Sequence, residues 1–196
     1  MRKMILPLAL SLILLLSACG AQVPETDNGA ADKGASAATD ASLRSFTALD
    51  LEGNQVDESI FADYELTMIN IWATYCGPCL NEMPDLGKLA VNYADKEVRI
   101  VGIVADVRQN ADGSFDSQMV NTAKELVRKT NANYLHLLPS KDLVTAKLSQ
   151  VSAVPETIFV DSMGNLVGNS YIGSRSGDSW AAIIDELLSE MQGELK

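Results

Sequence analysis

Short, almost wholly apolar runs alternate along this chain with longer stretches in which apolar residues recur at helical spacing. The runs at 66–73 (LTMINIWA) and 98–106 (VRIVGIVAD) predict strands that are buried on both faces of a sheet. Between them, a helix is expected from about residue 77 to 94, because apolar side chains recur there at the spacing of one helix face: Leu80, Met83, Leu86 and Ala90. This order predicts a βαβ unit with parallel strands.

The same patterning predicts further elements on both sides of this unit. Residues 46–57 read as two short extended pieces around a turn at Glu52-Gly53-Asn54. After residue 106 a polar loop leads into an inserted helical segment, with a helix expected through 120–129. The elements expected after it are a strand at 134–138, a short helix at 141–148 and strands at 157–161 and 166–173. A last helix is expected to begin near Asp178 as its N-cap and to have one apolar face: Trp180, Ile183, Ile184, Leu187, Leu188 and Met191. We therefore predict an α/β fold with a mixed central sheet flanked by helices and an N-terminal β-hairpin.

The first 18 residues have the pattern of an export signal. Arg2 and Lys3 precede an apolar run at 4–16, which is short for a membrane span and typical of a signal peptide. The run ends in Leu16-Ser17-Ala18-Cys19, which resembles a bacterial lipobox, where cleavage precedes the cysteine and its thiol carries a lipid. We interpret 1–18 as a lipoprotein signal peptide and Cys19 as the lipidation site. The alternative is an ordinary secretory signal with an incidental cysteine.

Composition separates a linker from one folded domain. Residues 20–42 are rich in Ala, Gly, Ser, Thr and Asp and show no apolar period, so we interpret 19–42 as the lipidated cysteine followed by a flexible linker. Residues 43–196 have the length of a single domain, and the 47% hydrophobic content of the chain is sufficient for its core. The net charge of −11 argues against a nucleic-acid partner and against charge-driven binding to anionic lipids.

The remaining cysteines, Cys76 and Cys79, lie in the run YCGPC where the first buried strand gives way to the helix. Cys76 is expected at the helix N-terminus, where free N–H groups and the helix dipole stabilise a thiolate, the attacking species in disulfide exchange. Cys79 is one helical turn further on and is placed to resolve a mixed disulfide. Gly77 and Pro78 suit the first helical turn, because proline there needs no intrahelical donor.

Two other uses of a CxxC pair fit the sequence less well. A structural zinc site needs four ligands, and the chain offers two thiols and the single histidine His136, which lies in a strand-like run and is assigned to sheet packing. A purely structural disulfide across so short a loop would restrict the unfolded chain very little. The pair therefore favours redox chemistry, with no metal and no cofactor.

The run Trp72-Ala-Thr-Tyr-Cys76-Gly-Pro-Cys79-Leu-Asn-Glu82-Met-Pro84 resembles the thioredoxin superfamily, and in it the membrane-tethered TlpA/ResA-like branch. The similarity extends over about residues 44–192 and implies a thioredoxin-like domain with a helical insertion. It implies that Pro84 kinks the active-site helix. It also implies that the Val154-Pro155 bond is cis and offers backbone to a bound substrate. Two positions depart from the common pattern: Tyr75 stands where thioredoxins usually have tryptophan, and Glu156 follows the expected cis-proline.

The resemblance also assigns roles to individual residues. The catalytic set is Cys76, Cys79 and Glu82, the last as an acidic residue that takes part in proton transfer or tunes the cysteine pKa; the alternative is an exposed helix glutamate. The expected client-contacting residues are those around the pair: Trp72 as a wall of the active-site surface, Tyr75, Gly77, Pro78, Val154 and Pro155.

The function predicted from these features is that of a thiol-disulfide oxidoreductase that is lipid-anchored on the extracytoplasmic face of the cell membrane. It is expected to act as a monomer that reduces client proteins, such as apocytochrome c in cytochrome c biogenesis or an exported methionine sulfoxide reductase, and to be recharged by an upstream membrane thiol donor. The alternatives are a disulfide oxidase or isomerase, a peroxiredoxin-like peroxidase and a metal-binding lipoprotein. The peroxidase is disfavoured because Ala73 stands where a threonine or serine is expected, three residues before Cys76.

Overall fold

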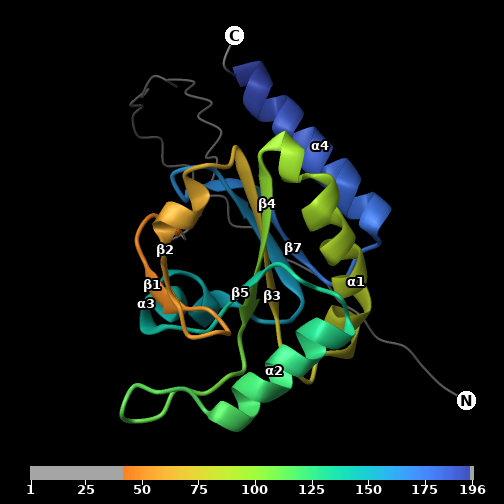
Figure 1. The fold of residues 1–196 in the computed structure, drawn as a ribbon. Coiled ribbons are helices and arrows are strands. Elements are labelled where there is room, and N and C mark those ends of the chain that lie inside the picture. Colours follow the sequence, from red (N-terminus) through yellow and green to blue (C-terminus); the bar gives the residue numbers. More distant parts are fainter. Residues whose placement is uncertain (1–41, 195–196) are drawn as a thin grey trace, which may run out of the picture. The chain divides into compact units, whose positions relative to one another are not determined.

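The computed structural model of this protein describes residues 42–194. The predicted signal peptide at 1–18, the lipidation site Cys19 and the linker up to residue 41 lie outside the described residues and stay predictions. Within the described part, the chain forms two short paired strands, a five-stranded sheet and four α-helices (Figure 1).

The N-terminal hairpin has the predicted position. Strands β1 (Thr47–Leu49) and β2 (Gln55–Asp57) pair antiparallel. The turn between them is closed by Asp50, whose carboxylate accepts hydrogen bonds from the backbone N–H groups of Glu52 and Asn54, each at 2.8 Å. Gly53 has a φ of +88°, a left-handed conformation that glycine adopts without strain. A short 3-10 helix, η1 (Glu58–Phe61), leads to the main sheet.

The main sheet has the order β5-β4-β3-β6-β7. Its parallel part consists of β3 (Leu66–Trp72), β4 (Val98–Val104) and β5 (Leu135–Leu137), and its antiparallel part of β6 (Glu156–Val160) and β7 (Leu166–Ile172). All seven residues of the central strand β3 are buried, as its almost wholly apolar sequence predicts. The predicted mixed sheet is confirmed.

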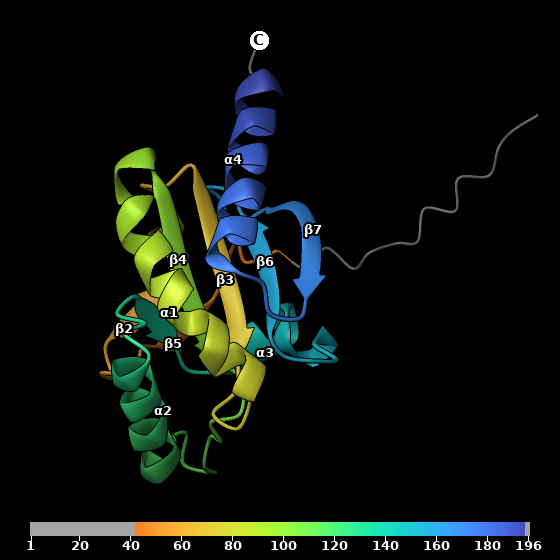
Figure 2. The same ribbon diagram turned by 90° about the vertical axis from the view of Figure 1, so that its right-hand side faces the viewer.

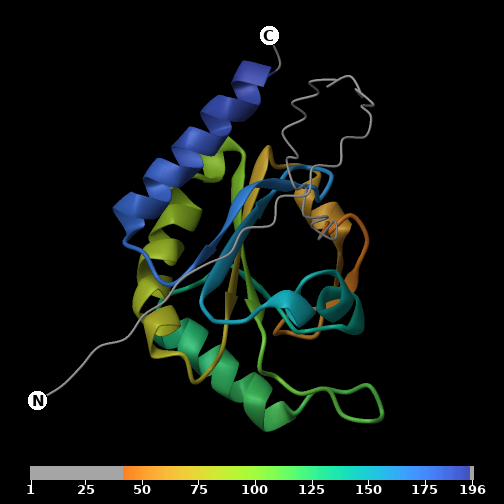
Figure 3. The same ribbon diagram turned by 180° about the vertical axis from the view of Figure 1, so that it is seen from behind.

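Different elements cover the two faces of the sheet. Helices α1 (Gly77–Asn92) and α4 (Gly177–Glu194) pack side by side on one face, over a core that includes Met68, Leu86 and Trp180 (Figure 2). Helix α3 (Lys141–Ala146), η1 and the hairpin cover the other face. Seen from behind, α3 and the hairpin lie on the side opposite α1 and α4 (Figure 3).

Helix α2 (Ser117–Lys129) is the inserted helix, and it lies at the end of the sheet where β3 and β4 finish (Figure 1). Its buried Ala123 belongs to a third core cluster that contains both cysteines of the CxxC motif. The insertion is therefore packed against the site rather than appended to the surface.

The last helix begins at Gly177, within one residue of the predicted start, but its predicted N-cap is wrong. The N-cap of α4 is Ser176 and not Asp178, because the Ser176 hydroxyl accepts a hydrogen bond from the Ser179 N–H at 3.3 Å and the helix begins at Gly177. Asp178 lies in the first turn, where its negative charge is favourable to the helix dipole. The predicted apolar face is confirmed, with Trp180 and Ile184 completely buried.

Candidate active site

The CxxC motif lies at the junction of β3 and α1. Cys76 is the N-cap of α1: its Sγ accepts a hydrogen bond from the Cys79 N–H at 3.2 Å, and its own N–H donates to the Ala73 carbonyl at 3.0 Å. The turn before it is held by the segment that follows β4, because the Asp106 carboxylate accepts hydrogen bonds from the N–H and the hydroxyl of Thr74. These bonds fix the backbone that carries Cys76.

Cys76 and Cys79 form a disulfide, with their Cα atoms 5.3 Å apart. Both cysteines are buried, but Cys79 has no exposed surface, whereas 5% of Cys76 is exposed. Cys76 is therefore the sulfur that an incoming group reaches first. Pro84 lies inside α1, five residues beyond Cys79, as expected.

The predicted client-contacting residues divide into exposed and buried ones. Tyr75 is 78% exposed, and Gly77 and Pro78 are exposed beside it. Val154 is half-buried and packs against the cluster that contains the cysteines, and Pro155 is buried. The Val154-Pro155 peptide bond is cis, which confirms that assignment.

Trp72 does not form part of the active-site surface, and this prediction is wrong. Its side chain is completely buried, because β3 lies in the middle of the sheet. Its indole N–H donates to Nδ1 of His136 at 3.1 Å, and Nε2 of His136 lies 2.9 Å from the Ala132 carbonyl, so the imidazole proton is on Nε2. Burial lowers the pKa of His136 to about 4, so the ring is neutral at pH 7. His136 is a packing residue, as predicted.

Glu82 is buried rather than exposed, with 3% of its surface accessible. One carboxylate oxygen, Oε1, accepts from the Asn70 amide at 2.9 Å. The other, Oε2, accepts from the Arg175 backbone N–H at 3.0 Å and from the Trp180 indole N–H at 3.3 Å. The alternative of an exposed helix glutamate is therefore excluded.

Burial is the largest influence on the ionisation of Glu82, and it raises the pKa of this carboxyl above the ordinary value of 4.5. The hydrogen bonds from Arg175, Asn70 and Trp180 and the charge of Arg175 oppose this shift, because they favour the carboxylate. A buried carboxyl with a raised pKa, one helical turn from the inner cysteine, has the properties of a proton acceptor or donor.

The sequence did not reveal the partners of Glu82. Asn70 was the one partner that the sequence could have indicated, because asparagine is unusual in a buried apolar strand. Thr67, the other polar residue of this strand, gives no such signal, because threonine is common in strands. Its amide donates both to Glu82 and to the Thr157 hydroxyl, the latter at 3.2 Å. Arg175 and Trp180 are 93 and 98 residues away from Glu82 along the chain, and neither stands in a recognisable motif with it.

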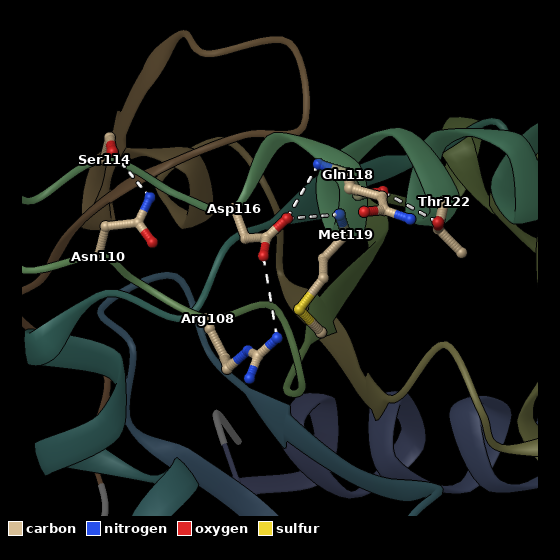
Figure 4. Close-up of polar contacts among 7 residues, drawn as sticks. All are labelled: Arg108, Asn110, Ser114, Asp116, Gln118, Met119 and Thr122. Atoms are coloured by element: carbon tan, nitrogen blue, oxygen red, sulfur yellow. Dashed lines mark hydrogen bonds and ion pairs between the residues drawn. The ribbon is translucent and has the colours of Figure 1, made fainter.

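The loop between β4 and α2 is another feature that the sequence marked only as polar. Asp116 ends this loop and caps α2, accepting hydrogen bonds from the N–H groups of Gln118 at 2.9 Å and Met119 at 3.1 Å (Figure 4). The Arg108 guanidinium lies 3.9 Å from the Asp116 carboxylate, and the Asn110 amide donates to the Ser114 hydroxyl (Figure 4). These contacts give the loop a defined shape at the same end of the sheet as Cys76.

Glu156, the residue after the cis-proline, forms a buried ion pair. It faces away from Glu82, because neighbouring residues of a strand point to opposite faces and Thr157 contacts the Asn70 amide. Its Oε1 accepts from the Lys147 ammonium and from the Ser170 hydroxyl, and both charged side chains are less than 10% exposed. The pair joins the end of α3 to the first residue of β6, directly after the cis-proline.

No group of three or more His, Cys, Asp or Glu side chains within residues 42–194 is arranged to hold a metal ion. No helix among the same residues has the length and apolar character needed to cross a bilayer.

Taken together, a central mixed sheet, a CxxC pair at the N-terminus of the first helix and a cis-proline before β6 define a thioredoxin-like protein. The sequence profile of the Redoxin family matches residues 31–179, more than half of the chain, so the chain belongs to the redoxin family.

The chain is similar in sequence to proteins named for thiol-disulfide exchange. The thiol-disulfide oxidoreductase ResA of Bacillus thuringiensis subsp. konkukian is 34% identical over 73 residues, which cover 37% of this chain and 42% of that relative. The thiol:disulfide interchange protein DsbE of Yersinia pestis is 26% identical over 145 residues, which cover 74% of this chain and 69% of that relative. The chain thus matches less than half the length of the ResA relative.

Solved structures confirm the fold. A thioredoxin-family thiol:disulfide interchange protein from Chlorobium tepidum superposes with a TM-score of 0.62 at 19% identity, covering 75% of this chain and 95% of its own. The exposed lipoprotein thioredoxin Etrx1 of Streptococcus pneumoniae superposes with a TM-score of 0.58 at 23% identity, covering 73% and 99% of the two chains. The predicted thioredoxin-like fold is confirmed.

Proposed function

We propose that this protein is a thiol-disulfide oxidoreductase in which Cys76 is the nucleophile and Cys79 the resolving cysteine. The observation that carries the proposal is the position of Cys76 as the N-cap of α1, bonded to a fully buried Cys79. The helix N-terminus stabilises the Cys76 thiolate, and the burial of Cys79 protects the second sulfur from attack.

In the reducing direction the two cysteines act in sequence. The Cys76 thiolate attacks one sulfur of a client disulfide, forms a mixed disulfide and releases the other client sulfur as a thiolate. Cys79 then loses its proton and attacks Cys76 Sγ, which closes the Cys76–Cys79 disulfide and releases the second client thiolate. The client gains two electrons, which the cysteine pair loses. Glu82 is the proposed acceptor of the Cys79 proton, because it is buried one helical turn further along α1.

The surface around Cys76 is the proposed docking site for the client. Tyr75 offers a large exposed aromatic ring, and Gly77 and Pro78 leave the approach to Cys76 free of bulky side chains. Val154 and Pro155 immediately precede β6, and the backbone groups of Val154 are the proposed partners of an extended client segment. A client peptide that pairs with this backbone would bring its disulfide to Cys76.

We further propose that the protein works on the extracytoplasmic face of the cell membrane, anchored through Cys19, as a monomer recharged by a membrane thiol donor. The candidate clients are apocytochrome c and an exported methionine sulfoxide reductase. The support for this is the lipobox-like sequence and the family relationship. Cys19→Ala should release the protein from membranes of its host or block its processing, and membrane fractionation will show whether it does.

The reaction is tested with the purified protein and a reductant. We expect it to accelerate the reduction of insulin, and Cys76→Ser to abolish this activity, whereas the same change at the exposed Thr122 should leave it intact. Insulin reduction that survives in Cys76→Ser would refute the proposed mechanism. In cells, Cys79→Ser should leave mixed disulfides on Cys76, and identification of the trapped proteins will name the clients.

The direction of the reaction is tested by the reduction potential. The helix N-terminus favours the thiolate and hence the reduced protein, but the buried Glu82 carboxylate opposes a second negative charge close to it. We expect the carboxylate to dominate and the potential to lie nearer thioredoxin, about −270 mV, than DsbA, about −120 mV. A potential above roughly −180 mV, measured in a glutathione buffer, would make the protein an oxidant or isomerase.

A further inference from the structure

The loop between β7 and α4 contacts two parts of the site that are far apart in sequence. The Gly173 N–H donates to the carbonyl of Pro155 at 2.8 Å, and the Arg175 N–H donates to Glu82 Oε2 at 3.0 Å. Gly173 has a φ of +90°, so glycine suits the sharp change of direction at the end of β7. The same few residues therefore bond to the cis-proline and to the buried carboxylate.

The side chain of Arg175 holds this loop in shape. Its guanidinium donates to the carbonyls of Gly173 at 3.0 Å and Ile172 at 3.4 Å. The guanidinium carbon also lies 5.0 Å from the ring centre of Tyr171 and 5.1 Å from that of Trp180. The Trp180 ring that it covers is the one whose N–H donates to Glu82. Removing this side chain would release both ends of the loop.

We propose that Arg175 is a positioning residue for the disulfide-exchange reaction, which through its loop sets both the docking backbone at Pro155 and the hydrogen bonds to Glu82. This inference rests on the proposed function of Cys76, Cys79 and Glu82. Arg175 itself is half-buried and touches no reacting atom in the described structure. Its effect passes through the backbone N–H groups of residues 173 and 175 and through its positive charge, which favours the Glu82 carboxylate.

The expected effect on pH dependence follows from the groups around Glu82. Those are Arg175 from the loop, Tyr134 from the segment before β5 and the cysteine pair on the same helix. Burial raises the pKa of Tyr134, and the Glu82 charge adds to this shift. Arg175 favours the Glu82 carboxylate through its N–H and its positive charge. Loss of either raises the pKa of Glu82, so the base form appears only at higher pH.

The experiment uses pre-reduced full-length protein mixed with increasing concentrations of a peptide disulfide in a stopped-flow instrument. The saturating rate reports the resolving step of Cys79, and the half-saturating concentration reports docking. In Arg175→Ala, the pH below which the saturating rate falls should move to a higher value, because the Glu82 carboxylate loses part of its stabilisation. The substitution should also raise the half-saturating concentration several-fold.

Control variants separate this role from a structural one. Arg128→Ala removes the same charge from an exposed position on α2 and should change neither quantity. Arg175→Lys keeps the charge but loses the planar guanidinium, so docking should stay impaired while part of the pH shift is recovered. Glu82→Gln should abolish the fall of the saturating rate at low pH (the acid limb) without changing the half-saturating concentration.

The outcomes distinguish this inference from the proposed function. If Arg175→Ala changes only thermal stability, or moves only one of the two kinetic quantities, the coupling through the loop is refuted. If Glu82→Gln leaves the acid limb in place, Glu82 is not the base, and that part of the proposed function fails. Turnover by Cys76→Ser would refute the cysteine mechanism itself.

Discussion

Replacing Glu82 with glutamine removes one buried charge and leaves its surroundings able to adapt. The glutamine carbonyl can accept from Arg175 and Trp180, as Oε2 does in the native protein. Its NH2 group would then face the Asn70 amide, which in the described structure has its Oδ1 buried without a hydrogen-bond partner. A rotation of the Asn70 amide by 180° presents this oxygen to the new donor. Glu82→Gln should therefore fold normally and report on charge alone.

The sign and size of the effect on stability follow from the raised pKa of Glu82. The folded protein holds this proton to higher pH than the unfolded chain does, where the ordinary value of 4.5 applies. The stabilisation is fully present below pH 4.5 and is lost as pH rises through the pKa of the folded state. A single proton limits the slope to about 1.4 kcal/mol per pH unit. Glu82→Gln has no carboxyl to titrate at this position and does not lose this stabilisation. The free energy of unfolding of the variant, relative to that of the native protein, should therefore increase with pH.

The measurement is urea unfolding of the oxidised protein between pH 4 and 8, in which the intact disulfide keeps the two thiols from titrating. Plotting the difference between Glu82→Gln and the native protein cancels the titration of every other group. Glu125→Gln, on the exposed side of α2, is the matched control and should give a flat difference. A flat difference for Glu82→Gln as well would refute the argument that burial dominates the ionisation of Glu82.

Two further predictions concern buried polar groups away from Glu82. His136, with a pKa of about 4 in the folded protein and 6.5 unfolded, should destabilise the protein by about 3 kcal/mol as pH falls from 6.5 to 4. His136→Gln should remove this acid sensitivity in urea titrations, and a persistent loss would assign it to other groups. Lys147→Met should cost about 3–5 kcal/mol, because it leaves Glu156 buried and unpaired, whereas Lys129→Met at an exposed pair should cost less than about 1 kcal/mol. Recovery of most of that loss by adding Glu156→Gln would show that the unpaired charge, and not lost packing, is its cause; no recovery would contradict this.

Local patterns in the sequence were sufficient to predict the helices and strands and the position of the two cysteines between a strand and a helix. The apolar run of β3 and the helical spacing after it predicted the junction that carries Cys76, because strand and helix periods differ and the change between them marks the boundary. The order of elements then predicted the parallel pair and the covered sheet. The cis bond before Pro155 came from the family resemblance, since no local pattern requires it.

Tertiary structure decided which side chains face the site. Trp72 is next to the motif in sequence, yet the sheet buries it and turns its indole toward His136. Glu82 has the sequence context of a surface helix residue, and only the packing of α1 against β3, the β7–α4 loop and α4 encloses it. Its partner Arg175 acts through a backbone N–H, which every residue except proline possesses, so no residue type in the sequence could identify it. The ionisation of Glu82 depends on desolvation and on donors brought together from distant segments, and both exist only once the chain has folded.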